Sequence, residues 1–91
     1  MYLYCIANSQ GQCKFGFSKD PQSRVRSLQT GSSEELILLE TVAVGDRCVR
    51  EMERLLHREF AHLRCRGEWF NCSGEDGVAF LQWFSIHYLS D

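Results

Sequence analysis

The stretch that decides the fold is residues 2–31, which read YLYCIANSQGQCKFGFSKDPQSRVRSLQTG. Side chains alternate over residues 2–7, with the aromatic and β-branched content that is typical of a strand. Residues 8–12 contain Gly11 and form a predicted turn, and residues 13–17 run back as a second strand. The stretch therefore begins with a predicted β-hairpin.

A helix is predicted after the hairpin, and it begins at Asp20 and Pro21. An aspartate can accept hydrogen bonds from free amides of the first turn, and a proline at the first helical position loses only an amide that has no partner. The helix is expected to end near Gly31, and Val25 and Leu28 give it a narrow apolar edge.

Residues 36–44, LILLETVAV, are almost continuously apolar, which is typical of a central strand covered on both faces. Asp46 is expected to cap a second helix, whose apolar stripe is Val49, Met52, Leu56, Phe60 and Leu63. Ser73 and Asp76 resemble a capping box at the start of a last helix. The order β-β-α-β-α-α predicts an α/β fold, a small sandwich in which helices flank a three-stranded sheet.

The length of 91 residues is typical of one domain, residues 1–91, with a modest core. No apolar run approaches the roughly 18 residues that cross a bilayer, and a signal peptide is not evident, so we expect a cytoplasmic protein without membrane contact. The five cysteines are odd in number and form no CxxC pair, which predicts reduced thiols. A zinc site of Cys65, Cys72 and His57 or His62 can be drawn, but its spacing matches no common zinc pattern.

The formal net charge is −2, and the charges are unevenly distributed. All ten Lys and Arg residues precede Gly67, where they outnumber eight acids, and the last 25 residues carry four acids and no Lys or Arg. A basic face that suits nucleic acid is therefore compatible with an acidic chain. The alternative is a solvated helix that carries charges of both signs.

Five segments carry a resemblance: YLYCIA, KFGFS, SRVRSLQTG, EMERLLHREF and RGEWF. In this order they resemble the GIY-YIG endonuclease superfamily, and more narrowly its phage and bacterial branch with a KIG-like second motif and an LH..F...R..GEWF tail. The resemblance covers about residues 2–72. It implies a β-β-α-β-α-α fold and endonuclease activity on DNA, with one divalent ion, Mg²⁺ or Mn²⁺, held by a glutamate.

The resemblance also assigns residues position by position. Tyr4 matches the tyrosine of the first motif, which would help to activate the attacking water. Lys14 stands where many relatives have the tyrosine of the second motif, and Gly16 is that motif's glycine. Arg24 matches the helix arginine that would contact the scissile phosphate, and Glu53 matches the glutamate that would hold the metal.

The proposed chemistry has a physical basis. Phosphodiester hydrolysis builds up negative charge, so a fixed cation and a metal near the phosphate lower the barrier. Arg24 suits this role because a guanidinium stays charged and can hold two phosphate oxygens. A tyrosine with a pKa of about 10 is a poor base at neutral pH, so Lys14 or the metal is expected to lie near Tyr4 and favour its phenolate. His57, one turn after Glu53, is a further catalytic candidate, either as a proton shuttle or as a residue that stabilises its surroundings.

Other residues have predicted roles in binding or geometry. The predicted DNA-binding residues are Arg26, Arg50, Arg54 and Arg58. Gly16 and Gly31 are expected to serve backbone geometry. Trp69 and Phe70 are expected in the core at the sheet edge, with stacking on a base as the alternative. Asn71 is the candidate for the superfamily's late asparagine.

The alternative to a nuclease is a catalytically impaired module that binds nucleic acid or a protein partner, including a homodimer or a phage-encoded inhibitor of host defence. Its binding face would carry Arg47, Arg50, Arg54 and Arg58. The acidic total favours this alternative, and so does Leu28, which stands where many superfamily nucleases have a histidine. The retained Tyr4, Arg24 and Glu53 favour the nuclease.

Overall fold

The computed structural model describes residues 1–45 and 49–89. In these residues the chain forms one antiparallel sheet of five strands in the order β3-β1-β2-β5-β4. The strands are β1 (Tyr2–Ala7), β2 (Gln12–Ser18), β3 (Ile37–Ala43), β4 (Arg64–Arg66) and β5 (Trp69–Asn71). The N-terminal hairpin predicted from the sequence is therefore present as β1 and β2.

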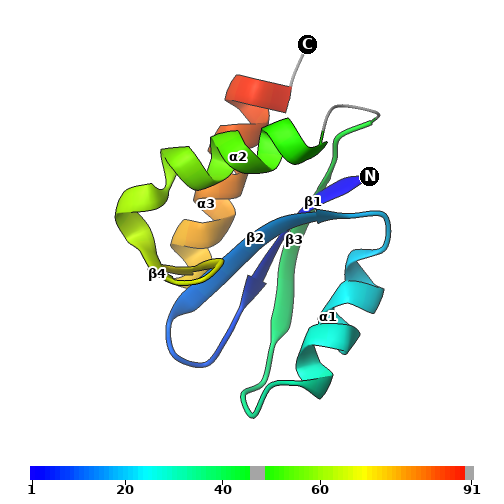
Figure 1. The fold of residues 1–91 in the computed structure, drawn as a ribbon, viewed down its shortest axis with the longest axis vertical. Helices are drawn as coiled ribbons and strands as arrows, with labels where there is room; N and C mark the ends of the chain where they lie inside the picture. Colours follow the sequence, from blue (N-terminus) through cyan, green and yellow to red (C-terminus); the bar gives the residue numbers. More distant parts are fainter. Residues whose placement is uncertain (46–48, 90–91) are drawn as a thin grey trace.

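The helices lie on both sides of this sheet, with α1 on one side and α2 and α3 on the other (Figure 1). They are α1 (Pro21–Thr30), α2 (Val49–Glu59) and α3 (Gly74–Phe84), and the shorter helical segments are the 3₁₀ turn η1 (Ala61–Leu63) and the π-helical segment η2 (Ser85–Leu89). Across the described ranges, none of these helices is long and apolar enough to cross a membrane.

The predicted three-stranded sheet is wrong, because two further strands follow α2. Residues 64–66 and 69–71 form a short hairpin around Gly67, which has a φ of 58°, and its second strand pairs with Gln12 to Lys14 of β2. Strands of three residues are too short to show an apolar alternation. Their pairing with β2 joins distant parts of the chain, which a local pattern does not reveal. The sequence pattern therefore missed them.

Strand β3 lies at the edge of the sheet, so the prediction of a central strand covered on both faces is also wrong. Its residues alternate between exposed and half-buried, and Ile37 is 51% exposed. A bulge opposite β1 leaves Leu39 as an extra residue, so Leu38 packs with the cluster under α1 whereas Val42 packs with the core under α3. The run is apolar because the strand contributes to two cores in turn.

The predicted N-terminal caps of α1 and α3 are present. The Asp20 side chain accepts a hydrogen bond from the Ser23 amide at 3.1 Å, and Pro21 is the first residue of α1. The Ser73 hydroxyl accepts a hydrogen bond from the Asp76 amide at 3.1 Å at the start of α3. Asp46 and Arg47 lie outside the described residues.

The sheet has two apolar faces because side chains alternate along its strands. Odd-numbered residues of β1 and β2, such as Leu3 and Phe15, join the larger core under α2 and α3. The even-numbered Tyr4 and Ile6 join a smaller cluster under α1 that includes Leu28. Tyr4 is therefore buried from the face opposite to the main core.

Candidate functional site

An open sheet edge creates the candidate site. Strand β5 covers only Gln12 to Lys14 of β2, so among the described residues the rest of β2 has no strand on that side. A cleft of about 270 Å³ lies at this uncovered part of β2, where residues from both faces of the sheet reach the edge. We call it the Tyr4 cleft, and its lining includes Tyr4, Gly16, Ser18, Arg24, Glu53 and Glu68.

The Tyr4 hydroxyl lies against Gly16, its neighbour across the β1–β2 ladder. A Cβ atom at position 16 would be 2.5 Å from the Tyr4 Oη and 2.7 Å from Cζ. Gly16 has no positive φ, so its role is to make room for the ring and not to adopt a special conformation. Gly31 has an ordinary φ of −95°, and the nearest atom to a Cβ there is 4.0 Å away, so the expected conformational role does not apply to it.

Arg24 is the cation that shares the cleft with the Tyr4 hydroxyl and affects its pKa. Burial raises the pKa of Tyr4, and the hydrogen bond and positive charge of Arg24 offset part of that rise. The phenol is therefore protonated at neutral pH. The sequence led us to expect Lys14 or the metal near this hydroxyl, and in the structure Lys14 pairs with Glu68.

Lys14 is 6% exposed and its Nζ donates a hydrogen bond to Glu68 Oε2. This ion pair lowers the pKa of Glu68, even though burial acts in the opposite direction. Glu68 stands on the turn between β4 and β5 and lines the Tyr4 cleft, whereas Lys14 is not among its lining residues. Sequence reasoning assigned no role to Glu68, and its place within the RGEWF segment was the one signal that could have found it.

Glu53 reaches the cleft from α2, on the far face of the sheet from α1. Its half-buried side chain lines the Tyr4 cleft together with Arg24 of α1 and Tyr4 of β1. The three residues that the resemblance placed at the reaction centre thus come from three separate elements and line one cleft. Their roles in catalysis remain predictions.

His57 lies in an adjoining surface hollow with Glu53, Arg50 and Arg54. Its Nδ1 is 2.8 Å from the Arg64 guanidinium, and its ring makes an edge contact with Phe70 at 5.5 Å between centroids. Burial and the charge of Arg64 lower the pKa of His57, so the ring is neutral at pH 7 and Nδ1 accepts the hydrogen bond. This arrangement leaves Nε2 as the ring N–H donor.

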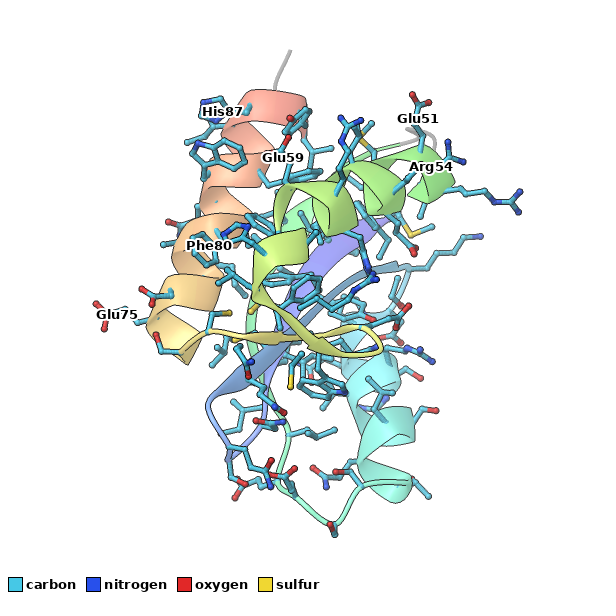
Figure 2. All side chains as sticks on the ribbon, turned by 60° about the vertical axis from the view of Figure 1, so that its left-hand side comes forward. Glu51, Arg54, Glu59, Glu75, Phe80 and His87 are labelled. Carbon is cyan, nitrogen blue, oxygen red and sulfur yellow. The ribbon has the colours of Figure 1, made fainter. Side chains whose placement is uncertain are left out.

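The predicted DNA-binding arginines are not all at the cleft. Arg50 and Arg54 line the hollow beside Glu53, and Arg54 extends away from α2 (Figure 2). Arg26 and Arg58 are exposed but line neither the cleft nor this hollow. Asn71 is exposed on β5 opposite Gln12 and does not line the cleft either.

The cleft offers two carboxylates to a cation, Glu53 and Glu68. The described residues contain no group of three or more His, Cys, Asp and Glu that could form a metal cage, which gives no support to the zinc site drawn with Cys65 and Cys72. Mg²⁺ commonly takes one or two carboxylates and keeps several waters, so hard oxygen donors at an open cleft fit Mg²⁺ or Mn²⁺.

A family model for the T5orf172 domain matches residues 1–85. The chain belongs to the T5orf172 domain family. This domain is phage-associated and is often linked to nuclease-like functions, and the domain type suggests nucleic-acid binding. The match does not point specifically to the GIY-YIG superfamily, so that resemblance remains a prediction. No curated protein and no solved structure matches the chain significantly.

Proposed function

We propose that this T5orf172 domain is a DNA endonuclease that hydrolyses phosphodiester bonds with one divalent ion, Mg²⁺ or Mn²⁺, as the GIY-YIG endonucleases do. One observation carries the proposal: Tyr4, Arg24 and Glu53 line the same cleft although they come from β1, α1 and α2. The cleft is open at the surface beside a hollow lined by Arg50 and Arg54. These arginines supply positive charge next to the place where a strand would enter.

Arg24 would bind a non-bridging phosphate oxygen, because its side chain is exposed at the cleft and stays charged. Tyr4 lines the same cleft, and Arg24 is close enough to lower the pKa of its hydroxyl, so the two groups would act on the same phosphate. With its pKa raised, Tyr4 keeps its proton and would orient an attacking water through a hydrogen bond rather than deprotonate it.

Glu53 would hold the divalent ion, with Glu68 as the other carboxylate of the cleft. Such an ion supplies two effects, a lower pKa of a bound water and compensation of the negative charge that develops on the phosphate. Lys14 neutralises Glu68 and fixes the β4–β5 turn at the rim.

A plasmid-nicking assay in Mg²⁺ or Mn²⁺ tests the proposal with matched pairs of variants. Glu53→Gln is paired with Glu51→Gln, which changes an exposed carboxylate on the same helix that does not line the cleft (Figure 2). Arg24→Ala is paired with Lys19→Ala, which removes an exposed positive charge just before α1 that does not line the cleft. We expect Glu53→Gln and Arg24→Ala to lose about 100-fold or more in rate, and their partners to stay near the wild type.

The proposal fails if the wild-type protein leaves the plasmid intact in either metal, or if Glu53→Gln nicks as fast as Glu51→Gln. The first outcome, combined with retained DNA binding, supports the second candidate function, a binding module without turnover. Leu28 favours that candidate. It stands where many superfamily nucleases have a histidine, and its side chain packs against the apolar cluster between α1 and the sheet.

A further inference from the structure

A second hollow lies at the other end of β2 from the Tyr4 cleft. Its volume is about 400 Å³, within the range of small-molecule sites. We call it the Trp69 pocket, and its lining includes Asn8, Gln10, Gln12, Glu34, Leu36 and Trp69. The function proposed above does not use any of these residues.

The lining chemistry suits a nucleobase. Trp69 is half-buried, so part of the indole packs in the apolar cluster of Tyr4 and Ile6 while part lines the pocket. An aromatic side chain beside amide side chains can stack on a base and bond to its edge. None of the described residues that line the pocket is a Lys or Arg, and Glu34 brings a carboxylate, so a phosphate group does not fit.

Hydrogen bonds already orient the polar groups of the pocket. Asn8 Nδ2 donates to Gln12 Oε1 at 2.8 Å, which directs the amide nitrogen of Gln12 toward Cys65 Sγ at 3.2 Å. Sulfur is a weak acceptor, so this nitrogen remains available to a stronger one. Glu34 Oε1 accepts from the Ser9 hydroxyl at 2.7 Å. The other carboxylate oxygen is an acceptor for an N–H group of a ligand, as an exocyclic amino group of a base would provide.

The Trp69 pocket and the Tyr4 cleft lie along one strand. Gln12 lines the pocket and Gly16 lines the cleft, four residues further along β2. At about 3.3 Å per residue this separation is about 13 Å, the length of about four stacked nucleotides or fewer extended ones. Trp69 and Glu68 are consecutive residues, and each lines one of the two sites.

We propose that the Trp69 pocket holds an unpaired nucleobase with an exocyclic amino group, from a DNA strand whose scissile phosphate lies in the Tyr4 cleft. The proposal rests on the proposed function, since it assumes that a strand runs between the two sites. It assigns stacking to Trp69, N–H donation to Gln12 and acceptance from the amino group to Glu34. Thymine lacks that amino group and is bound less well.

Tryptophan fluorescence tests the pocket separately from cleavage. The chain has two tryptophans, so Trp83→Phe leaves Trp69 as the only one, and Glu53→Gln with EDTA prevents turnover. This double variant is titrated with the pentanucleotides dA₅, dC₅ and dT₅, with a dA₅ strand in which every base is replaced by an abasic site, and with free dAMP. We expect saturable quenching by dA₅ and dC₅, with about tenfold weaker binding of the abasic strand.

The specificity is tested by Glu34→Gln, with the exposed neighbour Glu35→Gln as its matched control. Glu34→Gln should weaken binding of dA₅ and dC₅ toward that of dT₅, and Glu35→Gln should change nothing. The proposal is overturned if the abasic strand binds as tightly as dA₅, if the two glutamate variants behave alike, or if dAMP alone binds as tightly as the pentanucleotide. Base-dependent quenching without wild-type nicking would support this pocket and refute the nuclease, and nicking without base-dependent quenching would do the reverse.

Discussion

Gly16→Ala is the substitution that most directly tests how the site is built. The added Cβ would lie 2.5 Å from the Tyr4 Oη, whereas ordinary van der Waals contact begins at 3.4 Å, so the ring must move by about 0.9 Å. Tyr4 is 3% exposed and packed under α1, so the ring cannot move freely. Overpacking of this kind costs about 1–3 kcal/mol of the free energy of unfolding, and a displacement near 1 Å at a reaction centre costs about 100-fold in rate.

Chemical denaturation and thermal melting measure the stability change, which should lower the Tm by about 4–8 °C for each kcal/mol. Gly31→Ala is the control, because a Cβ there would be 4.0 Å from the Leu28 carbonyl oxygen and the φ of −95° suits alanine. We expect that control to be neutral or slightly stabilising. In a Tyr4→Leu background the cost of Gly16→Ala should shrink, since the colliding ring is gone. An equal cost in both backgrounds, or equal effects of the two alanine substitutions, would refute the contact.

Three further predictions follow from charge and packing. Burial and the Arg64 charge lower the pKa of His57, so its midpoint in an NMR titration should lie below the ordinary 6.5, and Arg64→Ala should raise it. A midpoint at or above 6.5 in the wild type would contradict this. The pKa of Glu68 in the folded protein is below its ordinary 4.5, so its pair with Lys14 stabilises the fold above pH 4.5, and this stabilisation is lost as the pH falls through the lowered value. The difference in unfolding free energy between wild type and Glu68→Gln should therefore vanish in acid. A difference that stays constant with pH would contradict the ion pair. Gly77→Ala should destabilise the protein by about 1–3 kcal/mol in urea unfolding, because its Cβ would be 2.6 Å from a buried thiol in β2; an unchanged midpoint would show that α3 can shift.

Local signals in the sequence were enough for the elements that they control directly. The aspartate and proline at residues 20 and 21 set the start of α1, and the serine at residue 73 set the start of α3, because a cap is a contact between residues three apart. The resemblance also selected Tyr4, Arg24 and Glu53, which line one cleft. The resemblance could not predict which side chain each of these residues contacts.

The amino-acid sequence by itself determined the hairpin, the helix starts and the types of side chain that reach the cleft, since these depend on neighbours along the chain. Only the tertiary structure decided that β3 is an edge, that residues 64–71 complete the sheet, and that Lys14 binds Glu68 while Arg24 lies beside Tyr4. The order of the strands depends on which distant segments pair, and pairing between residues more than 50 positions apart, as between β2 and β5, leaves no periodic trace in either segment.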